Sequence, residues 1–356
     1  MAISQLSLTD FRNLKSTTLD LDPRLNLISG ANGSGKTSLL EAIYILCQAR
    51  SFRSHQLKQC IQYGKPGFLL FGRFEGFKAG LAKNSKKLEI RIDGETIKRR
   101  SELVSRAPVN ILNADIFQLI EGSPQKRRAF LDWCLFHVEP DYAEHWRKFQ
   151  HALKQRNRLL KSRKDLKLLD YWDQHLLDPS LEISSMRREY SGAVENILTG
   201  ELGKVLSGIP LEINYQQGWP AHQDLAEALH GHREGDIRSG FTSVGIHRDD
   251  IVMTSEGRKV GEILSRGQSK RLCLALLLAV LNLVNKTRKN RIILLIDDLH
   301  SELDQEAQHL AYDQLLDMDL QLFISNIESI APGPPGAKEF KLFHVEHGTI
   351  KPRNFS

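Results

Sequence analysis

The sequence lacks any hydrophobic run long enough to cross a membrane. The longest strongly apolar run, Leu272–Leu281, has ten residues, whereas a membrane-spanning helix needs about 20. The residues from Met1 to Phe11 also lack the basic start and the apolar core of a signal peptide. We therefore expect a cytoplasmic protein that does not interact with a membrane.

Cysteine is scarce as well, and the few cysteines are far apart. The four positions are Cys47, Cys60, Cys134 and Cys273. Because none of them forms a C-x-x-C pair, a zinc site and a disulfide framework are both disfavoured. Scattered thiols of this kind are typical of the core of a protein in a reducing compartment.

Acidic residues are slightly fewer than basic ones. The 356 residues contain 49 Lys and Arg against 43 Asp and Glu, which gives a formal net charge of +6. This excess permits nucleic-acid binding but does not establish it. Its distribution is more informative, because nine of the basic residues fall between Arg147 and Lys167, where the only acid is Asp165.

Glycine becomes rare in the middle of the chain, where the expected structure changes. Strand-like runs and glycine turns between residues 68 and 93 indicate an antiparallel sheet. From residue 123 to about 206 the composition favours helices instead, and three residues are expected to separate three or four of them. These residues are Pro140, Pro179 and Gly192.

Both ends of the chain predict parts of a buried parallel sheet. Leu25–Ser29 is an apolar strand, and Ser38–Ala49 has apolar residues at helical spacing. Near the other end, Ile292–Ile296 is an apolar strand of the parallel type, and Leu320–Ile324 is similar. A closing hairpin is expected over residues 340–351.

The fold class is therefore α/β, with a domain that is split by a helical insertion. We assign residues 1–120 to the first part of this domain, 121–206 to the insertion and 207–356 to the second part. The strands of the two outer segments must then pair in one sheet, because an all-apolar parallel strand is buried on both faces.

A glycine-rich segment between the first strand and helix has the pattern of a phosphate-binding loop. The pattern G-x-x-x-x-G-K-[ST] is formed by Gly30, Ala31, Asn32, Gly33, Ser34, Gly35, Lys36 and Thr37. Its glycines allow backbone N–H groups to face a phosphate, and the following helix directs its positive end at the same anion. In this interpretation Lys36 reaches the β- and γ-phosphates and acts in catalysis, and Thr37 offers a hydroxyl to Mg²⁺.

Two acids follow the apolar strand Ile292–Ile296. A parallel strand would deliver Asp297 and Asp298 to the carboxyl edge of the sheet, beside the phosphate loop. We expect Asp297 to hold Mg²⁺, directly or through water, and Asp298 to orient or deprotonate the attacking water. The alternative is that both acids cap the next helix, and the two roles are compatible.

A second anion-binding pattern precedes the buried helix that starts near Lys270. Leu264–Gln268 combines a serine hydroxyl, a glycine N–H and a helix N-terminus. Alone, Ser265 would be interpreted as an ordinary helix N-cap. A second site makes sense if Ser265, Gly267 and Gln268 close on the nucleotide of another molecule.

Two further polar segments follow the predicted strands at the same edge. Ser301–Asp304 comes after the acidic strand, and Ser325–Asn326 comes after the next strand. Such positions suit residues that sense a bound phosphate, and they equally suit helix caps.

These segments together resemble the ABC-type ATPases and, more narrowly, the RecF family of bacterial recombination-repair proteins. The resemblance covers essentially the whole chain, in order. The segments that carry it are Phe11–Asn13, Ala31–Gly33, Ser51–Arg53, Gly122–Asp132, Thr242–Asp250, Leu264–Gln268 and Asp297–Asp304. It implies an ABC-type P-loop ATPase domain with a helical insertion domain.

Three positions depart from the family pattern. Ile246 replaces a proline, which would loosen that turn. Asp298 stands where most ABC ATPases have glutamate, and because the shorter carboxylate should position water less well, we expect slow hydrolysis. Asn326 occupies the place of the usual switch histidine.

The resemblance implies ATP and Mg²⁺ as cofactors, with Arg12 as a further nucleotide-binding residue. It implies a head-to-tail homodimer in the ATP-bound form, whose closure creates a surface for DNA and whose hydrolysis releases it. The family acts at single-strand gaps, on single- and double-stranded DNA. With RecO and RecR it helps to load RecA.

The basic block fits DNA binding. Lys154, Arg158 and Lys161 are spaced four and three apart, so they share one face of a helix. Such a face would contact phosphates, which gives binding that depends on salt and not on sequence. The alternative is a solvated helix face without a ligand.

Two other functions stay open on the sequence alone. The ATP-hydrolysing subunit of a membrane transporter shares the phosphate loop and the second pattern, but there the segment equivalent to that between Lys36 and Ser265 is much shorter. A non-hydrolysing DNA scaffold that uses ATP only as a structural ligand is compatible with Asp298.

Overall fold

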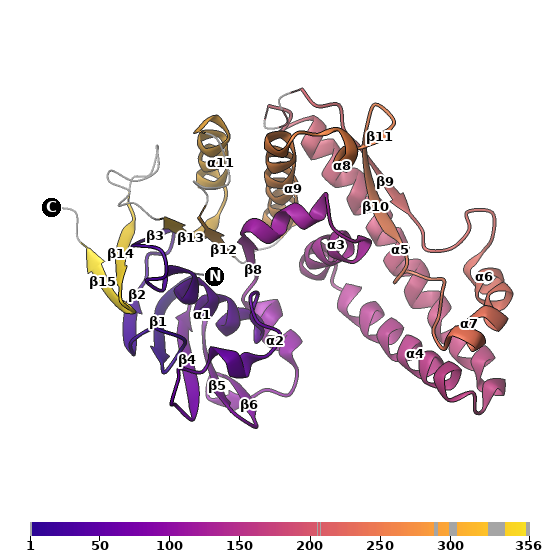
Figure 1. Cartoon of the computed structure of the whole chain (residues 1–356), viewed down its shortest axis with the longest axis horizontal. Coiled ribbons are helices and arrows are strands. Elements are labelled where there is room, and N and C mark those ends of the chain that lie inside the picture. Colours follow the sequence, from indigo (N-terminus) through magenta and orange to yellow (C-terminus); the bar gives the residue numbers. More distant parts are fainter. Residues whose placement is uncertain are drawn as a thin grey trace. The chain divides into compact units, whose positions relative to one another are not determined.

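The chain forms two units, and the first is assembled from both of its ends. The computed structural model describes residues 2–204, 206, 208–287, 291–298, 305–326 and 339–353. Unit 1 consists of Met1–Ile116 and Asn285–Ser356, and unit 2 of Phe117–Val284 (Figure 1).

A mostly parallel sheet of six strands forms one layer of unit 1, in the order β15-β14-β3-β13-β12-β8. Its strands are β3 (Leu25–Ser29), β8 (Val109–Leu112), β12 (Ile292–Asp297), β13 (Leu320–Asn326), β14 (Lys341–Glu346) and β15 (Thr349–Arg353). Leu25 in β3 is the register partner of Leu322 in β13. The prediction that strands from both ends pair in one sheet is therefore confirmed, as is the closing hairpin β14–β15.

A second, antiparallel sheet of unit 1 has the order β2-β1-β4-β5-β6-β7. Its strands are β1 (Ile3–Thr9), β2 (Thr17–Asp20), β4 (Gly67–Phe74), β5 (Phe77–Asn84), β6 (Leu88–Ile92) and β7 (Glu95–Thr96). The antiparallel sheet predicted between residues 68 and 93 is confirmed by β4, β5 and β6.

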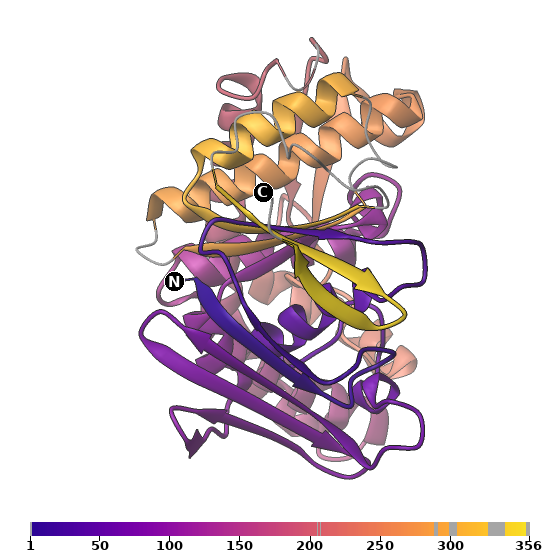
Figure 2. The ribbon, with the colours of Figure 1, turned by 90° about the vertical axis from the view of Figure 1, so that its left-hand side faces the viewer.

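Helix α1 (Lys36–Gln48) lies between the two sheets of unit 1 (Figure 2). It contacts β4 and β5 on one side and β8, β12 and β13 on the other. Because both sides are covered, all its residues except Thr37 are buried. Helix α11 (Gln305–Asp317) lies on the opposite face of the parallel sheet, and the short α2 (Arg100–Arg106) contacts α1.

Unit 2 begins with three consecutive helices and also contains a small antiparallel sheet. The helices are α3 (Pro124–Val138), α4 (Tyr142–Ser162) and α5 (Leu169–Thr199), and the strands are β9 (Glu212–Gln216), β10 (Asp250–Ser255) and β11 (Arg258–Lys259). Four more helices complete it: α6 (Leu225–Gly231), α7 (Arg233–Ser239), α8 (Val260–Ile263) and α9 (Arg266–Thr287).

Unit 2 extends further along the chain than the insertion expected at residues 121–206. β9 packs against α5 and β10 packs against α3, so the segment after residue 206 belongs with the helices. The chain returns to unit 1 only at Asn285. Composition located the change from strands to helices, but tertiary contacts decide where a unit ends.

The helix break expected at Pro179 is wrong, whereas the break at Pro140 is confirmed. α5 runs from Leu169 to Thr199 through both Pro179 and Gly192. An interior proline removes a hydrogen bond and costs about 3 kcal/mol or more. Here one side of α5 is buried against α3, α4 and β9, and Pro179 itself is buried, so packing offsets that cost.

Although its longest uninterrupted apolar run has only ten residues, α9 is one helix of the described part that is long and apolar enough as a whole to cross a membrane by length and composition alone. In the structure, 67% of its most apolar stretch is buried inside the protein. The core helices of soluble proteins pass the same test.

Candidate nucleotide-binding site

A pocket of about 650 Å³ opens in unit 1 where β3 and β12 end. Its volume lies within the range of roughly 300–1,000 Å³ that is usual for ligand sites. The residues that line it are Arg12, Asn13, Asn32, Gly33, Gly35, Lys36, Thr37, Ser38, Arg53, Gln59, Ile61, Asp297 and Asp298.

The loop between β3 and α1 depends on glycines at two close approaches. Gly30 has φ 149°, and a Cβ there would lie 2.3 Å from the carbonyl oxygen of Val345. Gly35 has φ 122°, and its Cβ would lie 2.6 Å from Leu14 Cδ2. At position 30 a side chain would collide with backbone, and at position 35 it would strain the positive φ and displace the Leu14 side chain.

The Lys36 ammonium is held inside this loop. Its Nζ donates to the carbonyl oxygens of Gly30 at 2.7 Å and Ala31 at 3.0 Å. Burial lowers the pKa of Lys36, and the nearby Asp298 and Asp297 oppose this effect. A phosphate would offer the ammonium an anionic acceptor, and hydrogen bonds between charged groups are roughly twice as strong as neutral ones.

Oxygen ligands suited to a hard cation lie side by side in the pocket. Thr37 Oγ1 lies 3.2 Å from Asp297 Oδ1, and Ser325 Oγ donates to the same Oδ1 at 2.6 Å. Mg²⁺ is usually held by one or two protein oxygens together with water and substrate phosphates. The donor set around Thr37 and Asp297 therefore fits Mg²⁺.

Asp298 also lines the pocket, directly after β12. Its backbone N–H donates to Ser325 Oγ at 3.2 Å, and its φ of 58° lies in the left-handed region. Non-glycine residues adopt this region rarely, often at functional sites. The helix-cap alternative, the segment Ser301–Asp304 and the Asn326 side chain lie outside the described residues.

Glu41, which no motif of the sequence singles out, organises one wall of the pocket. Its side chain is fully buried and receives two hydrogen bonds from Arg12, from Nε at 2.9 Å and Nη2 at 2.7 Å. These bonds keep the pKa of Arg12 above its usual range. Arg12 also donates to the Gln59 carbonyl and to Ser54 Oγ, so one buried carboxylate fixes Arg12 and, through it, residues 54–59.

Asn13, which belongs to the segment Phe11–Asn13 but was assigned no role from the sequence, supports the loop itself. Its Nδ2 lies 3.4 Å from the Gly33 carbonyl oxygen, and its Oδ1 accepts from Ser38 Oγ at 2.9 Å. The segment Phe11–Asn13 was the sequence signal for this wall. A glutamate inside a helix gave no comparable signal for Glu41.

The residues of the second anion-binding pattern lie in unit 2, and none of them is among the residues that line this pocket. Ser265, Gly267 and Gln268 are exposed at the start of α9. The Ser265 and Gln268 side chains each accept from the other's backbone N–H, at 3.3 and 2.9 Å. This reciprocal capping confirms the N-cap expected at Ser265 and leaves the surface open to solvent.

Comparison with known proteins identifies the family. Residues 2–331 match the RecF/RecN/SMC N-terminal domain. The chain is 38% identical to the DNA replication and repair protein RecF of Pseudomonas fluorescens, over 98% of both chains. The chain belongs to the RecF family. Its identity to RecF of Pseudomonas aeruginosa is 37%, over 98% of this chain and 97% of that one.

Solved structures agree with membership of the RecF family. The recombination mediator protein RecF of the RecFOR pathway, solved with ATP, has 25% identity and a TM-score of 0.88 over 99% of this chain and 98% of that one. An SMC head bound to a ScpA domain has 15% identity, 98% of its chain covered and a TM-score of 0.58, which shows a shared fold alone. The predicted ABC-type ATPase fold is confirmed. Because the chain belongs to the RecF family, it is not the ATP-hydrolysing subunit of a membrane transporter.

Two motifs of the RecF family meet in the interior of unit 2. Arg127 of the first donates to both carboxylate oxygens of Asp250 of the second, at 2.8 and 2.9 Å. Arg128 donates to the backbone carbonyl of Asp249. The segments Gly122–Asp132 and Thr242–Asp250 therefore join α3 to β10.

Arg187 on α5 completes this junction and was not anticipated. It donates twice to Asp132 at 2.9 Å, and once each to Asp249 at 2.6 Å and the Ile246 carbonyl at 2.8 Å. The Arg187 and Asp249 side chains have no exposed surface. The turn at Ile246, expected to be loose without its proline, is therefore tied to α5.

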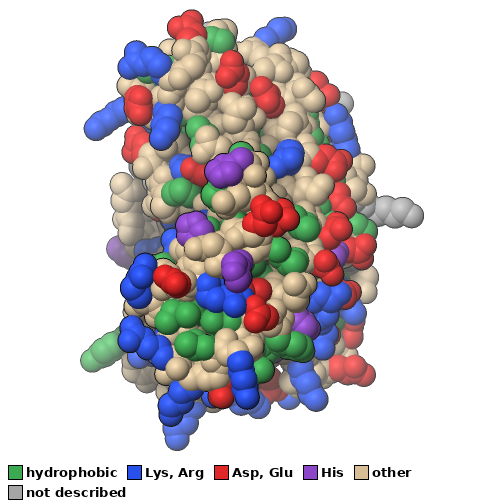
Figure 3. Space-filling view, turned by 90° about the vertical axis from the view of Figure 1, so that its right-hand side faces the viewer, with side chains coloured by type: hydrophobic (Ala, Val, Ile, Leu, Met, Phe, Trp, Pro, Cys, Tyr) green, Lys and Arg blue, Asp and Glu red, His purple; other side chains and the backbone are tan. Residues whose placement is uncertain are grey.

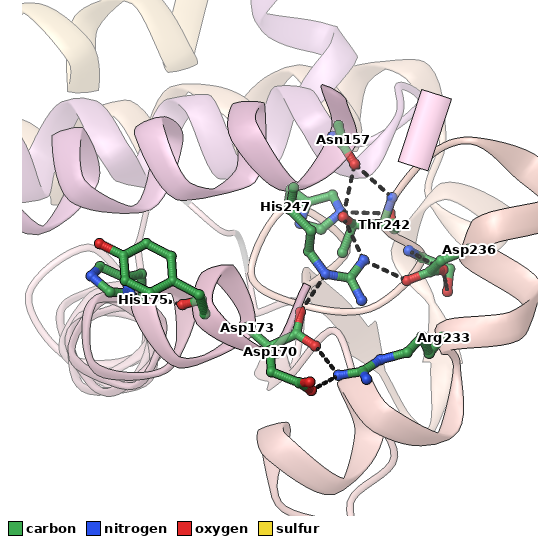
Figure 4. A network of polar contacts seen from close by, with 11 residues as sticks. Asn157, Asp170, Asp173, His175, Arg233, Asp236, Thr242 and His247 are labelled. Carbon is green, nitrogen blue, oxygen red and sulfur yellow. Dashed lines mark hydrogen bonds and ion pairs between the residues drawn. The ribbon is translucent and has the colours of Figure 1, made fainter. Parts of the chain in front are cut away.

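Arg156 is one of the nine basic residues between Arg147 and Lys167, but it does not share the exposed face of Lys154, Arg158 and Lys161. It is fully buried and pairs with Asp173 at 2.5 Å and Asp236 at 2.7 Å. Figure 4 shows both aspartates in the network that joins α4, α5 and α7, with Arg233 bound to Asp173. The contribution of Arg156 is therefore structural.

Proposed function

We propose that this chain is an ATP-dependent DNA-binding protein of recombinational repair. ATP binding drives head-to-tail dimerisation on DNA near single-strand gaps, and slow hydrolysis releases the dimer. The protein acts in the cytoplasm on the nucleoid and assists RecO and RecR in loading RecA. The observation that carries the proposal is the convergence of Lys36, Thr37, Asp297 and Asp298 on one pocket.

Each residue of the pocket has a defined task in this proposal. Lys36 leaves the loop carbonyls for the β- and γ-phosphates, and Arg12, held by Glu41, binds the nucleotide in the same pocket. Thr37 and Asp297 would hold Mg²⁺, which would supply positive charge to neutralise the phosphates. Asp298 orients the attacking water.

The exposed start of α9 supports the dimer. Because Ser265, Gly267 and Gln268 are absent from the pocket of their own chain and open to solvent, they are available to the nucleotide of a second copy. In that arrangement a helix N-terminus stabilises the γ-phosphate. Dimerisation is thus coupled to ATP.

A Ser265→Arg variant tests this coupling. Fluorescence anisotropy with a gapped duplex, at one fixed salt concentration, is measured with and without ATP and Mg²⁺. The parent should bind DNA about 5- to 150-fold more tightly with ATP, the usual range of coupling between sites. The variant should lose this gain, because arginine blocks closure without touching the phosphate loop.

Ser101→Arg, at an exposed position on α2, is the matched control and should keep the gain. If the DNA affinity of the parent does not change with ATP, or if the Ser265→Arg variant gains affinity like the parent, the proposed ATP-dependent closure on DNA is wrong. A parent that binds no DNA at all would also refute the DNA partner.

An Asp298→Asn variant separates a slow ATPase from a scaffold that only binds ATP. Single-turnover hydrolysis by the variant should fall by about 10²- to 10⁴-fold, the usual contribution of a group that moves the proton of the nucleophile. ATP affinity should change little, since Asn keeps the size of the side chain. Equal rates for parent and variant would remove the catalytic role of Asp298 and favour the scaffold.

A further inference from the structure

Unit 2 carries an exposed aromatic and basic surface that the nucleotide pocket does not use. We propose that it is a binding site for single-stranded DNA, whose unpaired bases stack on the aromatic rings. This inference rests on the proposed function and deepens it, because it names the form of DNA that the surface takes.

The basic part of this surface is a stripe along α4. Arg147, His151, Lys154, Arg158 and Lys161 follow one another at spacings of four, three, four and three, and all five are exposed. The stripe is ~21 Å long at 1.5 Å per residue. No acidic residue occurs in the sequence between Glu144 and Asp165. A polyanion would therefore meet only positive or neutral groups along this face of α4.

The aromatic part adjoins the stripe directly. The Trp172 ring at the start of α5 lies 5.5 Å from the His151 ring of the stripe. Tyr171 lies 5.0 Å from Trp172 and 4.1 Å from His175. Tyr171 is 53% exposed, and both histidines are exposed as well. We name Tyr171, Trp172 and His175 the aromatic shelf.

Buried ion pairs fix the shelf against the stripe. Arg156 on the inner side of α4 pairs with Asp173, the residue that follows Trp172 on α5. Asp170, next to Tyr171, has an exposed side chain that pairs with Arg233, and Arg233 also pairs with Asp173. In Figure 4, His175 lies apart from this network. The network thus holds the two helices together and leaves the shelf uncovered.

The chemistry favours single strands over duplexes. The bases of a duplex are stacked on one another, whereas unpaired bases stack on exposed aromatic rings while basic residues contact the phosphates. The lower half of the face in Figure 3 shows hydrophobic, histidine and basic side chains, with acidic side chains among them. A merely solvated basic face explains the stripe, but it does not explain two exposed rings, Tyr171 and His175, clustered with the half-buried Trp172 beside it.

The test compares Tyr171→Ala with the parent in anisotropy measurements on a thymidine 30-mer and on a 30-base-pair duplex, at one salt concentration and without nucleotide. Loss of one stacked base should weaken single-strand binding by about 5- to 150-fold. Duplex binding should stay within about twofold. Lys154→Ala should weaken both and reduce the salt slope by about one.

Tyr63→Ala is the matched control, because Tyr63 is fully exposed in unit 1 and should leave both affinities unchanged. The inference is overturned if Tyr171→Ala has no effect or weakens both DNA forms equally. If ATP tightens DNA binding by the parent while Tyr171→Ala leaves both DNA affinities unchanged, only this inference fails. If the parent binds neither form, the proposed function fails with it.

Discussion

Replacing Lys36 by alanine should weaken ATP binding roughly 30-fold or more. The Lys36 ammonium is the only lysine group among the residues that line the pocket, and it is held there by the Gly30 and Ala31 carbonyls. Losing a buried charge that pairs with an anionic group costs about 2–5 kcal/mol. Isothermal titration with ATP and Mg²⁺ measures the change directly.

Lys78→Ala is the control for Lys36→Ala, because Lys78 is an exposed lysine of β5 in the same unit. It should bind ATP like the parent. In the Lys36→Ala protein, DNA affinity should no longer respond to ATP, since closure needs the bound nucleotide. Unchanged ATP affinity in this variant would mean that the nucleotide does not use the loop.

Replacing Arg187 by alanine should destabilise unit 2 by about 3–5 kcal/mol, since it leaves a buried carboxylate unpaired. Asp249, which has no exposed surface, would lose its charged partner on α5, and Asp132 would lose two hydrogen bonds. The measurement is urea unfolding followed by tryptophan fluorescence. All four tryptophans lie in unit 2, at Trp133, Trp146, Trp172 and Trp219, so the signal reports this unit alone.

The neighbouring residue supplies the control for Arg187→Ala. Arg188 lies on the same helix but is exposed, with one 3.4 Å hydrogen bond to Gln217. Arg188→Ala should shift the unfolding free energy by no more than about 0.5–1 kcal/mol. A similarly small shift for Arg187→Ala would show that the buried junction between the two family motifs adds little stability.

The parallel sheet could be predicted because its signals are local. An all-apolar segment such as Ile292–Ile296 is compatible with few structures other than a buried strand. The phosphate-loop pattern lies between a strand and a helix that are both present as expected. The positions of Lys36 and Asp297 on one pocket follow from the rule that parallel strands end at the same edge. These elements could therefore be predicted without knowing which residues far apart in the sequence contact one another.

Other features depend on contacts that the sequence does not display. Glu41 looks like a surface residue of a helix until two sheets cover that helix. Arg156 stands in the same basic stretch of sequence as its exposed neighbours. Its burial becomes visible only in the structure, where it pairs with aspartates of α5 and α7. Pro179 predicts a helix end by its local chemistry, and packing of α5 overrides it.

The pairing of Leu25 with Leu322 has a consequence for the nascent chain. A ribosome adding 5–20 residues per second needs roughly 15–60 s to pass from one partner to the other. Unit 2 is continuous in sequence and emerges whole during that interval, whereas β3 and the phosphate loop wait for their neighbouring strands. We therefore expect the N-terminal segment to depend on chaperones until translation is nearly complete, and premature termination to yield chains that cannot hold nucleotide.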